Sequence, residues 1–184
     1  AKDGGGRVYA PHVVADLDAD GVTEIVVGNS KQVIAYEWKA GKLSLKAGWP
    51  VDTTTAGNAP EVRGLAAADL NGDGKIEVVA TTTQTASPKN GGAQVSGYSA
   101  DSKRYHPAGI SWHAGMGHSG YGCYGLNVGI GNIDDDPQLE ILATYDNHHI
   151  QAFDHDGVAI DSSPWFKNRD SKFSGQRLTW GQFI

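Results

Sequence analysis

An acidic loop of one design occurs three times in the chain, and this repetition limits the possible folds more than any other feature. The loops begin at Asp16 (DLDADGVTE), Asp69 (DLNGDGKIE) and Asn132 (NIDDDPQLE). Each has oxygen-bearing side chains at positions 1, 3 and 5, Gly or Pro at position 6, Glu at position 9, and then branched apolar residues. The loops start 53 and 63 residues apart (69 − 16 and 132 − 69). An internal period of this size predicts a repeat architecture such as a β-propeller.

The segments around each loop have the composition of short β-strands. A short apolar segment precedes each loop, a branched apolar run follows it, and a second β-rich segment comes next. A fourth short segment ends in GWPV at 48–51 in the first period and in SPWF at 163–166 in the third. No stretch shows sustained helical periodicity, and four short strands per period are typical of a propeller blade. The preceding segments are 12–15, 64–68 and 126–130, and the later β-rich segments are 32–38, 93–99 and 149–154.

The predicted fold class is therefore all-β, with propeller blades of four antiparallel strands. We expect the 184 residues to form a single partial propeller of about three blades, because a ring needs about four to eight blades to close. The open ends of such a stack would expose apolar faces, so we expect the remaining blades in cis, or another chain, to cover them. The predicted repeats span approximately 7–60, 61–124 and 125–176, and RLTWGQFI at 177–184 resembles the first strand of a fourth.

Charge and composition exclude several classes of partner. The formal net charge is −6 and the pI is near 5.5, which argues against nucleic acid or an anionic membrane surface and favours bound cations. No apolar run approaches the roughly 18 to 20 residues that span a bilayer. Cys123 is the only cysteine, so an internal disulfide framework is ruled out.

The loop design suits a hard cation. Side chains at positions 1, 3 and 5 of a tight acidic turn point toward one centre, position 7 can offer its carbonyl, and a carboxylate at position 9 can close the shell. Calcium takes about six to eight such oxygens, and without a cation the carboxylates would repel one another. An EF-hand loop starts in the same way, but it requires flanking helices and a Glu at position 12, where this chain has Val27, Ala80 and Ala143. We therefore expect calcium in a β-structured loop; solvated acidic turns are the alternative.

The loops resemble those of the FG-GAP / VCBS-type repeat family, the calcium-loop β-propellers that also form the heads of integrin α-subunits. The resemblance rests on D-x-[DN]-x-D-G-x-x-[DE] before a hydrophobic strand, and on the GWP that often ends such a repeat. It implies a ring of about seven blades, with up to three calcium ions in this chain, each between the first and second strand of a blade. The implied ligands are the side chains at positions 1, 3, 5 and 9 with the carbonyl at position 7: Asp16, Asp18, Asp20, Val22 and Glu24; Asp69, Asn71, Asp73, Lys75 and Glu77; Asn132, Asp134, Asp136, Gln138 and Glu140.

The third loop departs from the family pattern at two positions. Asn132 is a neutral first ligand, and Pro137 replaces the glycine at position 6. Glycine allows a positive φ, whereas proline fixes φ near −65°. We expect an ion in all three loops and, if only two bind, we expect the third loop to be the empty one.

A second candidate site lies in the irregular segment 105–125, between the second and third acidic loops. One interpretation is a surface that stacks on a sugar or contacts a protein, because aromatic side chains combine apolar faces with polar tips. A soft-metal site that also uses Met116 and Cys123 is another, and a glycine-rich surface loop that covers a blade edge is the third. The candidate ligand or partner residues are Trp112, His113, His118, Tyr121 and Tyr124.

The pattern favours a binding role over catalysis. No nucleophile elbow, Walker loop or HExxH motif is present, so no catalytic residue is assigned. We expect a calcium-stabilised module for adhesion or for scaffolding in a surface or secreted assembly, with a protein or glycan ligand. Extracellular modules bind calcium with dissociation constants of about 10⁻⁴ to 10⁻³ M, which predicts an extracellular, cell-surface or periplasmic location. A propeller-based, glycan-active enzyme of the polysaccharide-lyase kind and a subunit of an extracellular filament are the alternatives.

Overall fold

The described part of the chain consists of antiparallel β-sheets. A computed structural model of the chain describes residues 7–53, 61–83, 95–103, 105, 128–134, 136–145 and 149–157, and in these ranges it contains eleven strands and no helix. Within the same ranges, no helix is long and apolar enough to cross a membrane. The all-β prediction is therefore confirmed for the described residues, whereas a closed ring, the number of blades and the repeat boundaries stay predictions.

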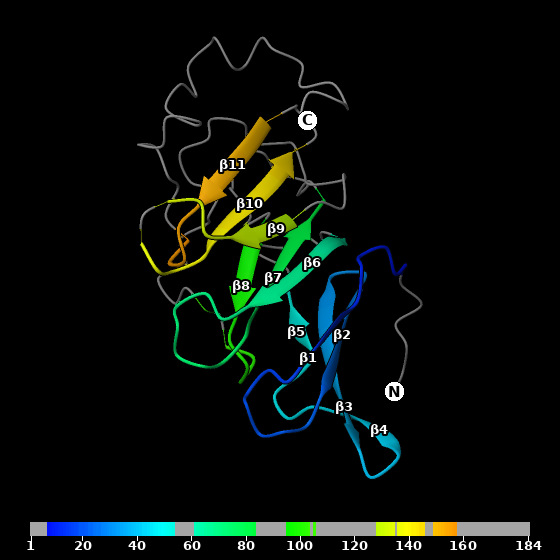
Figure 1. Cartoon of the computed structure of the whole chain (residues 1–184). Coiled ribbons are helices and arrows are strands. Elements are labelled where there is room, and N and C mark those ends of the chain that lie inside the picture. The colour runs from blue at the N-terminus through cyan, green and yellow to red at the C-terminus, as the bar shows by residue number, and fades with distance from the viewer. Residues whose placement is uncertain are drawn as a thin grey trace.

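Three sheets follow one another along the chain (Figure 1). The first sheet has the order β1-β2-β3-β4, with the short β5 paired to β3; the second has the order β6-β7-β8, and the third β9-β10-β11. All strand pairs are antiparallel. The bounds are β1 (Val13–Ala15), β2 (Glu24–Asn29), β3 (Gln32–Lys39), β4 (Lys42–Leu45) and β5 (Val51–Asp52); β6 (Val62–Ala68), β7 (Glu77–Thr82) and β8 (Val95–Tyr98); β9 (Val128–Gly131), β10 (Glu140–Tyr145) and β11 (His149–Phe153).

Each acidic loop connects the first two strands of its sheet in the same register. The last residue before the loop pairs with the Glu at position 9: Ala15 with Glu24, Ala68 with Glu77, and Gly131 with Glu140. Eight residues therefore close the same turn in all three sheets. The predicted strand–loop–strand arrangement is confirmed, and the EF-hand alternative, which needs flanking helices, does not fit it.

The sheets pack face to face around two hydrophobic cores. The middle sheet contributes to both: Val78 and Ala80 of β7 lie in the core shared with the first sheet, and Val79 lies in the core shared with the third. All six residues of β7 are buried, whereas buried and half-buried residues alternate along β2. Because neighbouring strand residues face opposite sides, β7 is covered on both faces and β2 on one.

Backbone hydrogen bonds join each acidic loop to the next. The N–H at position 8 of the second loop, Ile76, donates to the carbonyl at position 2 of the first loop, Leu17, at 2.9 Å. The same bond joins Leu139 of the third loop to Leu70 of the second at 3.1 Å. Leu17 and Leu70 are fully buried, whereas the equivalent Ile133 of the third loop is 43% exposed. A leucine at position 2 is thus covered wherever a further described loop follows it.

The GWP segment lies between the first and second sheets. The indole N–H of Trp49 donates to the carbonyl of Ala100 at 3.2 Å, and its ring meets the Tyr98 ring edge-on at 6.4 Å between centroids. The sequence predicts one fourth segment ending at 48–51, but the first sheet has β4 and β5 on either side of this turn. Pro50 has no N–H to donate to a strand partner, which explains the break. In the second and third sheets three strands are described.

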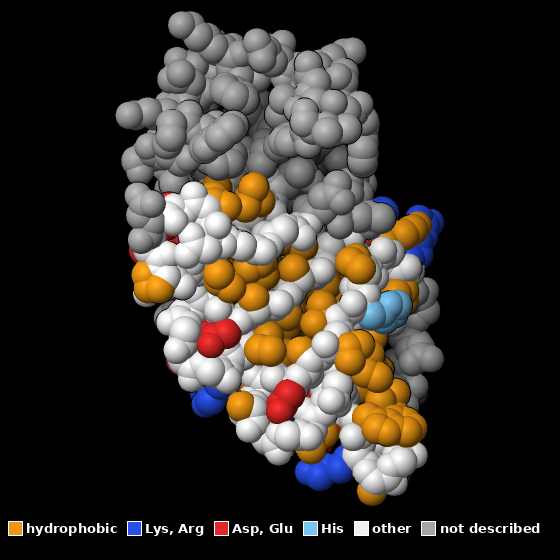
Figure 2. Space-filling model, viewed as in Figure 1, with side chains coloured by type: hydrophobic (Ala, Val, Ile, Leu, Met, Phe, Trp, Pro, Cys, Tyr) orange, Lys and Arg blue, Asp and Glu red, His pale blue; other side chains and the backbone are white. Residues whose placement is uncertain are grey.

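The face of the first sheet that points away from the second sheet is apolar. Val14, Ile25, Tyr36 and Leu45 form one row across β1 to β4, because directly paired residues share a face. Val14 is 66% exposed and Leu45 49% exposed. In Figure 2, hydrophobic side chains gather over the first sheet at the lower right of the view. We call this surface the outer face; its neighbouring rows are Val27 with Ile34 and Trp38 with Leu43.

Candidate metal centres

The Glu at position 9 is buried in all three loops and bonded in the same way. One carboxylate oxygen, Oε2, accepts the backbone N–H of position 2 in its own loop. The distance is 2.7 Å from Leu17 to Glu24, and 3.0 Å from Leu70 to Glu77. In the third loop Ile133 donates to Glu140 at 2.6 Å. At most 2% of each Glu is exposed. The carboxylate therefore ties the start of the loop to the start of the following strand and leaves its second oxygen, Oε1, for another partner.

Burial raises the pKa of Glu24, Glu77 and Glu140 above the ordinary value, although the hydrogen bond from position 2 opposes the shift. Neighbouring carboxylates add to the effect, for example Asp134 and Asp136 at Glu140. A buried carboxylate beside other carboxylates favours either a proton or a cation. Each of these three glutamates is therefore placed to interact with a positive charge.

Position 1 organises the turn in the first two loops. Both oxygens of Asp16 accept backbone N–H groups, from Asp20 at 3.1 Å and from Gly21 at 2.8 Å. Asp69 is bonded in the same manner, with Gly74 at position 6 donating at 2.8 Å. The glycines at position 6 have φ of +82° and +85°, a conformation that a glycine adopts without steric cost.

In the third loop both residues of this hydrogen-bonded pair, at positions 1 and 6, are different. Pro137 has no N–H, so the donor that position 1 receives in the other loops is missing. Asn132 stands there instead of an aspartate, and its side-chain amide donates to the carbonyl of Asp136. An amide can donate where a carboxylate can only accept, so the turn is closed with the direction of the hydrogen bond reversed. The two departures from the pattern are thus one structural change.

The N–H groups at position 7 bond to the aspartates at position 5 in every loop. Val22, Lys75 and Gln138 donate to Asp20, Asp73 and Asp136 over 2.8 to 2.9 Å. The carbonyls at position 7, which the family resemblance implies as ligands, stay a prediction.

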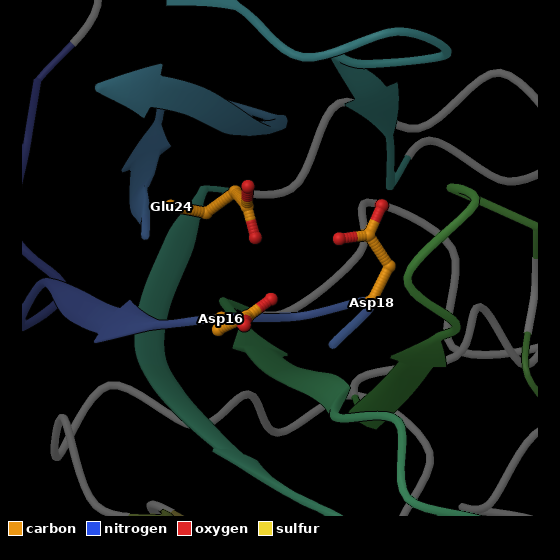
Figure 3. Close-up of side chains that lie close together, drawn as sticks. All are labelled: Asp16, Asp18 and Glu24. Atoms are coloured by element: carbon orange, nitrogen blue, oxygen red, sulfur yellow. The ribbon is translucent and has the colours of Figure 1, made fainter. Parts of the chain in front are cut away.

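Two of the loops bring three carboxylates close together. In the first loop one oxygen each of Asp16, Asp18 and Glu24 lies within 4.8 Å of the others. Figure 3 shows these side chains around a common space between the loop and β2. Asp20 lies outside this group. The third loop forms the same kind of group from Asp134, Asp136 and Glu140.

The second loop forms no such group among the described residues. Its position 3 is Asn71, whose side-chain oxygen accepts the N–H of Asp73 at 2.9 Å. Three carboxylates are therefore gathered in the first and third loops but not in the second, and each loop must be considered separately.

A lysine from outside the first loop also reaches its carboxylates, and sequence analysis missed it. The ammonium of Lys46 lies 2.7 Å from Asp18 Oδ2, 3.3 Å from Glu24 Oε1 and 3.6 Å from Glu37 Oε1, and the lysine side chain is 5% exposed. Burial lowers the pKa of Lys46, but the hydrogen bond to Asp18 and the charge of Glu24 outweigh it, so the net shift is upward. Two of the oxygens that the resemblance assigns to calcium thus already face a cation.

The third loop differs, because no described cation pairs with Glu140. Its Oε1 is buried and has no hydrogen-bond partner among the described residues, and the ion pairs formed within these ranges do not include it. A buried carboxylate oxygen without a partner is costly. The arrangement fits a cation held by Asp134, Asp136 and Glu140.

Other predicted residues lie outside the described part of the chain. These include the candidate ligand residues Trp112, His113, His118, Tyr121 and Tyr124, the fourth segment at 163–166 and the strand at 177–184. Their roles stay predictions.

The fold and the loops together define a repeat protein of antiparallel β-sheets joined by acidic loops. Residues 16–80 match the sequence profile of the FG-GAP-like repeat. This range contains the first two loops, the strands β2 to β6 and the start of β7, so this part of the chain matches an FG-GAP-like repeat, and the resemblance noted in the sequence is confirmed.

Comparison with whole proteins adds less. No curated protein matches the chain. Among solved structures, the crystal structure of the V. cholerae biofilm matrix protein Bap1 is similar at 19% identity and a TM-score of 0.32, over 80% of this chain and 27% of that chain. The chain therefore spans about a quarter of the length of that protein.

Proposed function

We propose that the chain is a calcium-stabilised module of a larger extracellular β-propeller, with a binding or scaffolding role. The observation that carries the calcium assignment is the state of Glu140. Its carboxylate is fully buried, one oxygen is held by the Ile133 N–H at 2.6 Å, and the other has no described donor while two aspartates lie beside it. A hard divalent cation is the partner that this oxygen set favours.

The larger assembly is supported by the outer face. Exposed apolar patches of this kind mark contact surfaces, and the middle sheet gives the pattern for how such a face is covered, because β7 is buried on both sides. The outer face, with Val14, Trp38 and Leu45 exposed, therefore packs against another sheet of the same kind, from the remainder of the protein or from a second chain. Light scattering would test this: a chain that stays strictly monomeric and binds no hydrophobic dye at this face would contradict it.

The location follows from the expected affinity. Three carboxylates and a few further oxygens, without a rigid cage, are typical of extracellular modules that bind calcium with dissociation constants of about 10⁻⁴ to 10⁻³ M. Such a site is filled where calcium is abundant, outside the cytoplasm. The ion then acts as a structural tie between the loop and β10, because it holds Glu140 of that strand together with Asp134 and Asp136 of the loop.

Thermal unfolding with and without calcium tests the assignment. At a free calcium concentration of about 100 times the dissociation constant, an ion that binds only the folded state adds about 2.7 kcal/mol to the free energy of unfolding. We expect Glu140→Gln to abolish most of this gain. Asp101→Asn is the matched control, since it removes one negative charge outside the three loops. Identical melting curves of the unmodified chain in calcium and in excess chelator would refute the calcium assignment.

A further inference from the structure

The position of Lys46 is fixed by the fold of the first repeat. It follows β4 directly, and its backbone N–H donates to the carbonyl of Ala35 in β3 at 2.9 Å. From there the side chain reaches the first loop and ends between Asp18 and Glu24, with Glu37 on the third side. An ammonium with three carboxylate neighbours and 5% exposure of its side chain is a built-in counter-ion.

The second repeat has a different residue at the same place. Tyr105 donates its backbone N–H to the carbonyl of Gly97 at 2.9 Å, as Lys46 does to Ala35. The two acceptors are equivalent, because each pairs with the residue two places after the Glu at position 9, Val79 in one sheet and Val26 in the other. We call this place the gate position.

The gate residue contacts position 3 of the acidic loop in both repeats. The charged Lys46 pairs with Asp18, whereas the neutral phenol of Tyr105 is hydrogen-bonded to the Asn71 amide. Charge at the gate position and charge at position 3 therefore match in each repeat. The gate residue of the third repeat lies outside the described residues.

An ammonium and a calcium ion compete for the same oxygens in the first loop. A calcium ligand oxygen lies about 2.3 to 2.6 Å from the metal, and Asp18 Oδ2 is already 2.7 Å from the Lys46 nitrogen. Two cations that share this oxygen would lie close together in a buried site, where like charges repel strongly. For Asp18 Oδ2 and Glu24 Oε1 to serve as calcium ligands, the Lys46 side chain would have to leave them.

We propose that the ammonium of Lys46 is the resident cation of the first loop, and that calcium binds this chain in loops where no described ammonium lies, foremost in the third. This inference deepens the proposed function and rests on it for the third loop only. It reverses the order expected from the sequence, in which the third loop is the weakest site because of Pro137.

Two backbone amides report on the loops separately. The Leu17 N–H is bonded to Glu24, and the Ile133 N–H is bonded to Glu140. A calcium titration followed by ¹H–¹⁵N NMR of the chain therefore gives one midpoint for each loop. In the unmodified chain we expect the Ile133 amide to respond at a calcium concentration at least ~10-fold below that of Leu17, because of the charge repulsion at Lys46.

Removal of the ammonium should open the first loop. Lys46→Met is expected to lower the calcium midpoint of the Leu17 amide at least ~10-fold, and Lys46→Gln, which keeps a polar side chain, should do the same if the methionine variant folds poorly. Lys31→Met is the matched control. Lys31 forms an ion pair with Asp52 at 2.8 Å in which both side chains are about 40% exposed. This variant removes one positive charge away from the loops and should leave both midpoints unchanged.

Two results would overturn the inference: equal midpoints for Leu17 and Ile133 in the unmodified chain, or an unchanged Leu17 midpoint in both Lys46 variants. The proposed function fails in a different way, when the Ile133 amide does not respond to calcium in any variant. In that case the Leu17 amide of the Lys46 variants still decides, since a response upholds the role of the ammonium and no response refutes it.

Discussion

The first and third loops share one template, yet they balance their negative charge by different means. In the first loop the protein supplies an ammonium, at 2.7 Å from Asp18 and 3.3 Å from Glu24. In the third loop Glu140 is equally buried, but no described residue supplies a positive charge. The comparison teaches that loops with one acidic template differ in whether the protein itself supplies a positive charge beside the buried glutamate. In the first loop that charge comes from Lys46, which follows β4 and lies outside the acidic template.

The largest expected effect separates the two buried glutamates. In chelator, Glu24→Gln should lower the free energy of unfolding by about 1.5–3 kcal/mol, because the buried ion pair with Lys46 at 3.3 Å is lost. Glu140→Gln should cost little or even stabilise, since it removes a buried charge that has no described partner, while the amide oxygen can still accept the Ile133 N–H. Urea unfolding of both variants in chelator gives the two values.

Addition of calcium should narrow or close that difference. Glu140→Gln then loses the stabilisation that the ion gives to the unmodified chain, whereas Glu24→Gln keeps it. Equal costs for the two variants in chelator would show that the loops are balanced alike, and the comparison would then be wrong.

A smaller effect is expected from the paired change in the third loop. Asn132→Asp replaces a donor to the Asp136 carbonyl with a negative charge, and Pro137→Gly adds chain entropy to the unfolded state; each should destabilise by about 1 kcal/mol. The double variant should form in the third loop the same hydrogen bond that Gly21 donates to Asp16 in the first loop. We therefore expect the double variant to be more stable than the sum of the single effects by about 0.5 kcal/mol or more. A double-mutant cycle by urea unfolding measures this coupling, and strict additivity would mean that the two departures are independent.

The smallest effect concerns pH. The pKa of Glu140 is raised in the folded state, mainly by burial, so the folded chain binds its proton more tightly than the unfolded chain, where the ordinary value is 4.5. Stability in chelator should therefore fall as pH rises from about 4.5 through the raised pKa. The difference between the unmodified chain and Glu140→Gln isolates this group. Thermal unfolding at several pH values should show the variant gaining relative stability toward neutral pH; a constant difference would contradict the raised pKa.

The sequence predicts the fold of the described repeats well, because the loop template fixes the register. Gly at position 6 and Glu at position 9 mark the turn and the start of the next strand, and the strands lie where the apolar segments predict them. The break at Pro50 is visible in the sequence, but the division into β4 and β5 depends on how Trp49 packs against the second sheet.

The site could be predicted only in part. The acidic ligands are local in sequence, whereas Lys46 lies 28 residues from Asp18 and reaches it through the pairing of β3 with β4. No local pattern marks it, since KLSLKAGWP resembles any strand end with a lysine. The equivalence of Lys46 with Tyr105 likewise follows from their backbone hydrogen bonds. An alignment of the acidic loops does not include either residue.

The bonds between successive loops have a consequence for how such a chain can change in evolution. The residue at position 2 donates its backbone N–H to the Glu of its own loop. In the first two loops its carbonyl also accepts the N–H of position 8 in the next loop. These hydrogen bonds involve only residues of the loop template, although the loops begin 53 and 63 residues apart in sequence. The ten additional residues of the longer interval take no part in them. Insertions between β-strands can therefore lengthen a repeat in sequence without breaking the backbone hydrogen bonds that join one acidic loop to the next.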